Sequence, residues 1–430
     1  MEKHNRIPVI WGLDKKYVLQ AFVVMRSILL NSKEVYFFLL LTADDIEDEV
    51  TEYADILKSE YNNFEVSVRM VDINCFADAR VFNEHLSKAA YFRLLIPELV
   101  PEYDKCIYLD CDIIVHGDLR ELYAVELEGN YLAGVKDCHV IKDNPYEIEH
   151  QRVLGLPARD KYINSGVLII NLKRMREDGI IPRFYEQLKK ENWYEDQDVL
   201  NYCCYPLIKL LPLQCNLFHF YLGKDIKCLY GLPYEENEFE FNYDRPYILH
   251  MGGQYKPWLN SEYKGSNEWW RLAEVFHKSE SYQFYKQKCQ KAEEENKLRN
   301  IVIKAGKSKS VAVWGYSKFG MRLCDFLLEY QLDNIVGIAD NNKGEWGKEY
   351  RGFPVVGLYS ILENYDDILW IIACQTSYDE VVQQLADVGV DGDDIVRYID
   401  KVSSYETIYL LALCENAYER MEAKLAGRQP

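Results

Sequence analysis

Two aspartates one residue apart stand at the end of a short apolar segment. In KCIYLDCDIIV, Asp110 and Asp112 follow the apolar residues Cys106–Tyr108 and precede Ile113–Val115. Carboxylate oxygens at the end of a buried strand suit Mg²⁺ or Mn²⁺, because these cations prefer hard oxygen ligands. The spacing alone is weak evidence, since a solvated turn capped by Asp has the same pattern. The chain has three such D-x-D triplets, at 110–112, 196–198 and 391–393.

A histidine with glycines and a lysine after it would complete such a site. His250 stands in YILHMGGQYKPW after another apolar segment, and Gly252, Gly253 and Lys256 follow it. An imidazole can join two carboxylates around a metal, glycines let the backbone approach a diphosphate, and a lysine can neutralise a phosphate oxygen. A lone histidine near a strand end is more often structural, so this interpretation depends on its neighbours.

Two further polar clusters lie where elements are expected to begin. Asn164–Gly166 directly precede the apolar segment Val167–Asn171, so they would face whatever lies above the sheet. In WYEDQDVLN, Asp196–Asp198 open a predicted helix. Acids in the first turn of a helix often serve only as caps, but these side chains could also hydrogen-bond sugar hydroxyls.

The elements that must position these residues form an α/β pattern. Apolar segments alternate with helical ones over residues 7–260, and Tyr17–Leu30 has the apolar spacing of a helix. The chain therefore opens as strand, helix, strand. The predicted strands are Ile7–Trp11, Val35–Thr42, Val66–Val71, Cys106–Tyr108, Ile113–Val115, Tyr131–Val135 and Val167–Asn171.

The 430 residues are enough for two domains. We expect a first domain over residues 1–265, a helical linker over 266–307, a smaller α/β domain over 308–402 and a last amphipathic helix over 403–430. The smaller domain has Gly315 and Gly320 in G-x-x-x-x-G, with Asp340 closing the next strand, as in part of a dinucleotide-binding unit. Because Ser317 stands where a second glycine would admit a pyrophosphate, we favour a packing or interaction role without a cofactor.

Charge and cysteine content narrow the classes of partner. Subtracting 69 acidic from 50 basic residues leaves a net charge of −19, which argues against broad binding to nucleic acid. Twelve cysteines without a C-x-x-C pair indicate free thiols in a reducing compartment. No apolar stretch approaches the ~20 residues of a membrane span. We expect a cytoplasmic protein, with peripheral contact at the inner membrane face as an option; the sequence leaves its oligomeric state open.

As a whole, the pattern resembles the retaining glycosyltransferases of family 8, which include bacterial lipopolysaccharide galactosyl- and glucosyltransferases. Six elements match in order: Asp14-x-x-Tyr17, Tyr91-x-Arg93-Leu94, YLDCD, NSGV, DQD and H-x-x-G-x-x-K-P-W. The resemblance implies a GT-A type nucleotide-sugar-binding domain with a mixed sheet. The smaller domain that follows is similar to Rossmann-like domains attached to many bacterial sugar-modifying enzymes.

The resemblance also implies roles for single residues. Asp110, Asp112 and His250 would ligate Mn²⁺ or Mg²⁺, and Asp110 would act in catalysis with Asp196 and Gln197. The residues that would bind the UDP-sugar are Asp14 and Tyr17 at the uracil, Arg93, Asn164, Asp196 and Gln197 at the sugar, and Gly253 and Lys256 at the diphosphate. Asp137 falls where the family contacts its acceptor.

The implied activity is that of a hexosyltransferase. It would transfer glucose or galactose from a UDP-sugar to a glycan or lipid-linked acceptor, with the anomeric configuration retained. Two alternatives stay open from the sequence: a nucleotide-dependent sugar oxidoreductase or epimerase that uses the smaller domain, and a non-catalytic scaffold that binds a sugar nucleotide without turnover.

Overall fold

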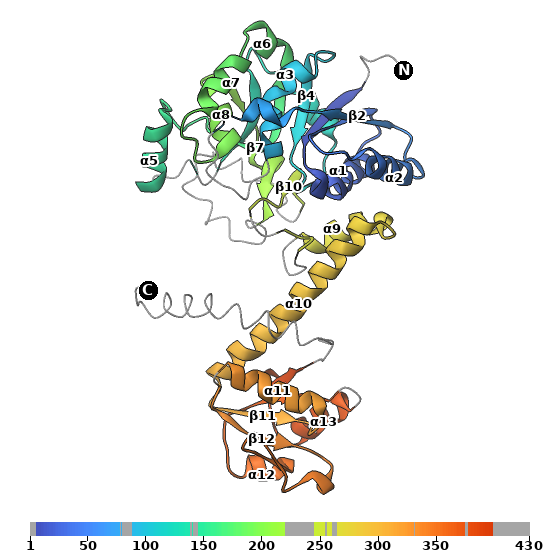
Figure 1. Cartoon of the computed structure of the whole chain (residues 1–430), viewed down its shortest axis with the longest axis vertical. Helices are drawn as coiled ribbons and strands as arrows, with labels where there is room; N and C mark the ends of the chain where they lie inside the picture. Colours follow the sequence, from blue (N-terminus) through green and yellow to red (C-terminus); the bar gives the residue numbers. More distant parts are fainter. Residues whose placement is uncertain are drawn as a thin grey trace. The chain divides into compact units, whose positions relative to one another are not determined.

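The computed structural model describes residues 6–77, 79, 88–137, 140, 145–219, 245–253, 256–259, 265–330, 332–374 and 377–398. The chain divides into two compact units, one up to Cys289 and the other from Gln290. The division falls inside helix α10 (Glu280–Lys307), the long helix of Figure 1. The helix expected over 403–430 lies outside the described residues, and the predicted domain limits stay a prediction.

The first unit is built on a seven-stranded mixed sheet, as expected for the α/β fold class. The strand order is β3-β2-β1-β4-β7-β6-β8. Strands β1 to β4 are parallel, β7 is antiparallel to both β4 and β6, and β8 is parallel to β6. The bounds are β1 (Ile7–Gly12), β2 (Tyr36–Thr42), β3 (Phe64–Met70), β4 (Lys105–Leu109), β6 (Leu132–Lys136), β7 (Ile163–Asn171) and β8 (Ile208–Leu210).

Successive residues of a strand point to opposite faces of the sheet. Each face of this sheet contributes to a core of its own. Val9 and Trp11 belong to a core with helices α1 (Val18–Asn31), α2 (Glu47–Lys58) and α9 (Ser266–Ala273). Ile10 and Tyr108 belong to the core on the other face. The elements that pack there are η4 (Lys88–Leu95), α3 (Ile96–Leu99), α6 (Leu172–Glu177), α7 (Ile181–Leu188) and α8 (Glu195–Cys204).

A small three-stranded sheet carries two of the predicted motifs. Its order is β5-β10-β9, with β5 (Ile113–Val115), β10 (Ile248–His250) and β9 (Leu217–Phe218). In this sheet His250 pairs with Ile113 on one side and with Phe218 on the other. The register therefore brings a histidine from late in the unit next to the residue that follows Asp112.

Further helices and short 3-10 turns complete the described part of the first unit. They are η2 (Lys15–Tyr17), η3 (Ile73–Phe76), α4 (Leu119–Tyr123), α5 (Pro145–Leu154), η5 (Leu213–Asn216) and η9 (Glu274–Phe276). Within the part of the chain that the structure describes, no helix is both long and apolar enough to cross a bilayer. The nine cysteines described there are all free thiols, as predicted.

Two details of the motifs differ from the prediction. Asn164–Gly166 do not precede a strand but form part of β7, which begins at Ile163. The pattern obscured this because polar residues at the end of a buried strand look like a loop. His250 does not follow a strand either, since it is the last residue of β10.

The second unit is a smaller α/β sheet with the order β13-β14-β12-β11-β15-β16, parallel except for the edge strand β13. One face packs against α10 and α11 (Lys318–Glu329), and the other against α12 (Leu358–Leu362) and α13 (Tyr378–Asp387). The strands are β11 (Ser310–Trp314), β12 (Ile335–Ala339), β13 (Glu349–Tyr350), β14 (Phe353–Val356), β15 (Ile368–Ile372) and β16 (Ile395–Arg397), and the 3-10 turns are η10 (Lys343–Glu345) and η11 (Gly392–Asp394).

Candidate functional site

The aspartate pair lies between β4 and β5, where the two sheets of the first unit meet. The backbone N–H of Asp110 donates to the carbonyl of Gly166 in β7 at 2.8 Å. The carbonyl of Asp112 accepts from the backbone N–H of Met251 at 2.7 Å. These bonds attach the D-C-D turn to β7 on one side and to the end of β10 on the other, which places both side chains at a shared strand edge.

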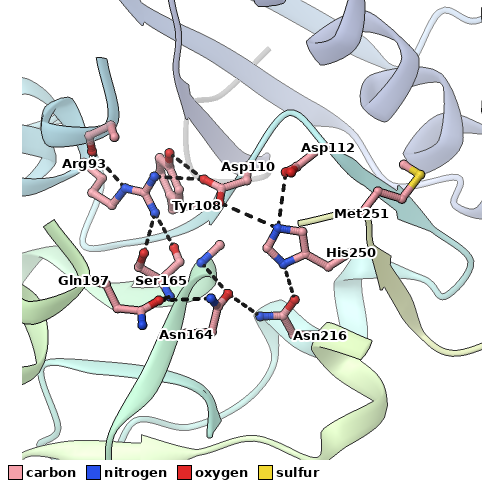
Figure 2. Close-up of polar contacts among 12 residues, drawn as sticks. Arg93, Tyr108, Asp110, Asp112, Asn164, Ser165, Gln197, Asn216, His250 and Met251 are labelled. Carbon is pink, nitrogen blue, oxygen red and sulfur yellow. Dashed lines mark hydrogen bonds and ion pairs between the residues drawn. The ribbon is translucent and has the colours of Figure 1, made fainter. Parts of the chain in front are cut away.

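Asp110, Asp112 and His250 converge, as the sequence predicted for a metal site (Figure 2). One ligand atom from each lies within 4.8 Å of the other two. The Nε2 atom of His250 is 3.2 Å from Oδ1 of Asp112 and 3.8 Å from Oδ2 of Asp110. Asp112 and His250 are only 8% and 3% exposed. Two carboxylates and an imidazole around one buried point form a donor set that fits Mn²⁺ or Mg²⁺.

A chain of side-chain amides sets which nitrogen of His250 faces the carboxylates. The backbone N–H of Gly166 donates to Oδ1 of Asn164 at 3.0 Å, which fixes the orientation of that amide. Asn216 then donates through Nδ2 to the same Oδ1 at 2.8 Å and turns its own Oδ1 to Nδ1 of His250 at 2.8 Å. Nδ1 must therefore carry a proton, so Nε2 presents its lone pair to a cation.

The space around the imidazole is tightly packed. A Cβ atom on Gly166 would lie 2.4 Å from Cε1 of His250 and 2.8 Å from Oδ2 of Asp110, so only glycine fits there. On the other side, the ring of Phe218 stacks on His250 at 4.6 Å between centroids. The ring orientation of His250 is thus constrained by packing as well as by hydrogen bonds.

Lys256 forms an ion pair with Oδ2 of Asp112 and donates to the carbonyl of Met251 at 3.2 Å. Burial alone would raise the pKa of Asp112, but the positive charge of Lys256 is the largest of the effects that outweigh burial, and that pKa lies well below its usual range. Asp112 is therefore ionised, and the lysine lies at the rim of the candidate metal site.

Arg93 is buried and connects two acids. It donates to Oδ1 of Asp110 at 2.9 Å, to the carbonyl and hydroxyl of Ser165 at 2.7 and 2.9 Å, and it lies 3.1 Å from Oδ2 of Asp196. Burial raises the pKa of Asp196 to about 6, although the positive charge of Arg93 opposes the shift. The arginine thus orients Asp110, a candidate metal ligand, and lies against an acid whose pKa is raised.

Gln197 is held at four points at the end of β7. Its Oε1 accepts from Asn164 Nδ2 and from the backbone N–H of Ser165, both at 3.0 Å. Its Nε2 donates to Oδ2 of Asp137 at 3.1 Å and to the Tyr162 hydroxyl at 3.4 Å. Because the backbone N–H of Ser165 can only donate, the orientation of the amide is unambiguous.

The remaining predicted residues surround this centre. The side chain of Asp14 accepts from the backbone N–H of Lys16 at 3.0 Å and caps η2. Tyr17 follows and meets the Trp258 ring edge-on at 6.0 Å; burial and the charge of Asp112 raise its pKa. Gly253 has φ +91°, a conformation that suits glycine.

Sequence reasoning missed three contributors to the site, Asn216, Phe218 and Tyr108. The Tyr108 hydroxyl donates to Oδ1 of Asp110 at 3.1 Å, and its ring lies 4.4 Å from the guanidinium carbon of Arg93. Tyr108 was visible in YLDCD as a strand residue, but Asn216 and Phe218 lie in no motif. They reach the site only because β9 pairs with β10.

Comparison with known proteins shows the class to which this fold and site belong. The family model for glycosyl transferase family 8 matches residues 8–262, so the chain belongs to this family and is a glycosyltransferase. It therefore acts on a nucleotide-sugar donor and a glycan acceptor. A second family model, C2185-like N-terminal, matches residues 307–396.

Similar proteins include a lipopolysaccharide 1,2-glucosyltransferase of Escherichia coli, 27% identical over 60% of this chain and 75% of the relative. Glycosyltransferase GlyF of Streptococcus pneumoniae serotype 4 is 26% identical over 62% of this chain and 61% of its own length. The solved galactosyltransferase LgtC, in complex with donor and acceptor sugar analogs, has a TM-score of 0.55 at 23% identity, over 65% of this chain and all of its own. That likeness supports the fold.

Proposed function

We propose that this protein is a metal-dependent retaining hexosyltransferase that moves glucose or galactose from a UDP-sugar to a glycan or lipid-linked acceptor. The observation that carries the proposal is the convergence of Asp110, Asp112 and His250, with the tautomer of His250 set by Asn216. The named activities of its relatives, a glucosyltransferase and a galactosyltransferase, support a hexose as the transferred sugar.

The metal ligands would hold Mn²⁺ or Mg²⁺ against the diphosphate of the donor. A dication there would offset the negative charge that develops on the departing nucleoside diphosphate. Lys256 would contact the same phosphates from the rim, and the open backbone at Gly253 would let them approach. We assign Asp14 and Tyr17 to the uracil by resemblance to the family; Asp14 caps η2, Tyr17 ends it, and the charge of Asp112 acts on Tyr17.

The polar cluster beside the metal ligands would bind the donor sugar. Arg93, Asn164, Asp196 and Gln197 offer donors and acceptors for its hydroxyls. Both lone pairs of Gln197 Oε1 already accept hydrogen bonds, so we assign Gln197 an electrostatic role next to the anomeric carbon rather than that of a nucleophile. Asp137, the residue after β6, accepts a hydrogen bond from Gln197 and would meet the acceptor.

Substitution of the metal ligands tests this proposal. We expect Asp110→Asn and Asp112→Asn to abolish both sugar transfer and Mn²⁺-dependent binding of UDP, measured by calorimetry with UDP-glucose, UDP-galactose and their N-acetyl forms. Asp391→Asn is the matched control, because it alters another D-x-D triplet, one whose Asp391 only caps η11. Full transfer activity in Asp110→Asn would refute a metal-dependent mechanism.

The oxidoreductase alternative has less support from the second unit. The hydroxyl of Ser317 accepts from the backbone N–H groups of Phe319 and Gly320, and Asp340 accepts from that of Tyr316 at 2.7 Å. A Cβ on Gly320 would lie 1.9 Å from the carbonyl oxygen of Gly315, so packing explains this glycine pair. Unchanged NAD(P)H fluorescence on mixing is the expected result, and UDP-sugar hydrolysis with Mn²⁺ would exclude the non-catalytic scaffold.

A further inference from the structure

A buried histidine lies behind Gln197, on helix α5. His150 is 1% exposed, and Asp198, its partner from α8, is completely buried. Nε2 of His150 lies 2.8 Å from Oδ1 and 3.0 Å from Oδ2 of Asp198. The rings of Trp193, Tyr194 and Tyr162 surround the imidazole at 4.9 to 5.8 Å between centroids. The pair is therefore shielded from solvent and joins α5 to the helix that carries Gln197.

Hydrogen bonds connect this pair to the Gln197 amide, and each donor in the series points from Gln197 toward Asp198. The Tyr162 hydroxyl donates its single proton to Oδ1 of Asp198 at 2.5 Å. Toward Gln197 it can then only accept, and Nε2 of Gln197 donates to it at 3.4 Å. Asp198 is thus the acceptor at the end of a chain that begins at Gln197. Asp198 also accepts from the backbone N–H of Tyr194 at 3.0 Å, just before α8.

His150 also faces a second carboxylate, that of Glu147. Its Nδ1 lies 3.5 Å from Oε2 of Glu147, whose other oxygen accepts from the Tyr194 hydroxyl at 2.7 Å. The imidazole thus lies between two buried carboxylates, and its Nε2 faces both oxygens of Asp198. A donor at that position satisfies Asp198, whose burial would be costly without a partner.

We propose that His150 is a positioning residue, which acts through Asp198 and Tyr162 to hold the Gln197 amide in its orientation. His150 itself touches neither Gln197 nor the metal ligands. The inference rests on the proposed function in one respect, namely the place of Gln197 beside the donor sugar. The hydrogen-bond chain itself can be tested without activity.

The first experiment follows the side-chain amide signals of Gln197 by NMR of the full chain, assigned through Gln197→Asn. We expect His150→Gln, which removes the imidazole that packs between Asp198 and Glu147, to shift these signals. His116→Gln is the matched control, because His116 also pairs with a carboxylate, Glu268 at 3.0 Å, but has no link to Gln197. Unchanged Gln197 signals in His150→Gln would overturn the proposal, whether or not the chain proves to be a hexosyltransferase.

The second experiment separates positioning from general stability. We expect His150→Gln and Tyr162→Phe each to lower kcat by about tenfold or more, as losses of supporting contacts do. The KM for the donor and the Mn²⁺-dependent affinity for UDP should stay within about twofold of the unmodified protein, because the metal ligands are untouched. Tyr162→Phe keeps the ring and removes only the hydroxyl, so it serves where His150→Gln does not fold.

The double variant gives the decisive comparison. If His150 and Tyr162 act along one chain, His150→Gln with Tyr162→Phe should lower kcat no further than the more severe single change. Effects that multiply, or an equal loss of UDP affinity, would overturn the proposal. If the unmodified protein shows no Mn²⁺-dependent binding of UDP, the proposed function is contradicted. The NMR experiment then remains the test of the hydrogen-bond chain from His150 to Gln197.

Discussion

Nδ1 of His250 lies 2.8 Å from Oδ1 of Asn216, and this contact leads back through Asn164 to the backbone N–H of Gly166. A fixed backbone donor in β7 thus sets the proton position on an imidazole in β10. The first prediction follows from this relationship. Asn216→Ala should weaken Mn²⁺ binding by about 10- to 100-fold, the usual cost of losing a partner behind a metal-bound histidine.

Calorimetric titration with Mn²⁺ alone would measure this loss. Asn63→Ala is a suitable control, because the Asn63 amide likewise donates to one carbonyl, that of Glu34 at 2.7 Å, but lies in the turn before β3. Equal Mn²⁺ affinity in Asn216→Ala and the unmodified protein would show that the Asn216 contact is not needed to orient His250.

Gly166→Ala should damage the site by steric overlap. The new Cβ would lie 2.4 Å from Cε1 of His250. The His250 ring cannot move freely away from it, because Phe218 stacks on that ring. We expect a loss of about 1–3 kcal/mol in the free energy of unfolding, typical of overpacking, together with weaker Mn²⁺ binding. In urea unfolding, Gly392→Ala should behave like the unmodified protein, since nothing lies within 4 Å of a Cβ there.

Lys256→Gln should change two affinities in opposite directions. Without nucleotide, Mn²⁺ should bind more tightly, because Lys256 no longer pairs with Asp112. With Mn²⁺ present, UDP should bind at least about tenfold more weakly, because a charged donor to the phosphates is lost. Lys189→Gln, which removes a surface ion pair with Glu186, is the control for both titrations. A parallel change in the two affinities would contradict the assigned position of Lys256.

Stability should depend on pH through Asp196. Its pKa is raised to about 6, so the folded protein favours the protonated acid. The stabilising contribution is then complete below about pH 4 and is lost as pH rises through about 6, by about 3 kcal/mol. Asp196→Asn does not titrate, so the unmodified protein should lose free energy of unfolding relative to this variant between pH 4 and pH 7. If the free energies of unfolding of the two proteins, measured with urea, change in parallel between pH 4 and pH 7, the raised pKa of Asp196 is contradicted.

Local pattern was enough to predict much of this protein. The spacing of apolar residues identified β1, α1 and β4, because strands and helices repeat with periods of two and 3.6 residues that can be read within a short window. The ordered motifs also identified the family, and with it the three converging side chains Asp110, Asp112 and His250.

Pattern failed where a residue's environment comes from a distant segment. Asn164–Gly166 looked like a loop before a strand but belong to β7. Asp198 looked only like a cap, and it does accept from the backbone N–H of Tyr194, but it is also the buried partner of His150. In both cases polar side chains tolerate burial because partners far along the chain satisfy their hydrogen bonds, and no local signal reports such partners.

The sequence by itself determined which residues end strands and which chemistry those residues could perform. Only the tertiary structure decided that Asn216 orients His250, that Arg93 bridges Asp110 and Asp196, and that His150 lies behind Gln197. The physical reason is that these contacts join residues far apart in sequence. Their distances depend on the order and register in which β4, β7, β9 and β10 pair.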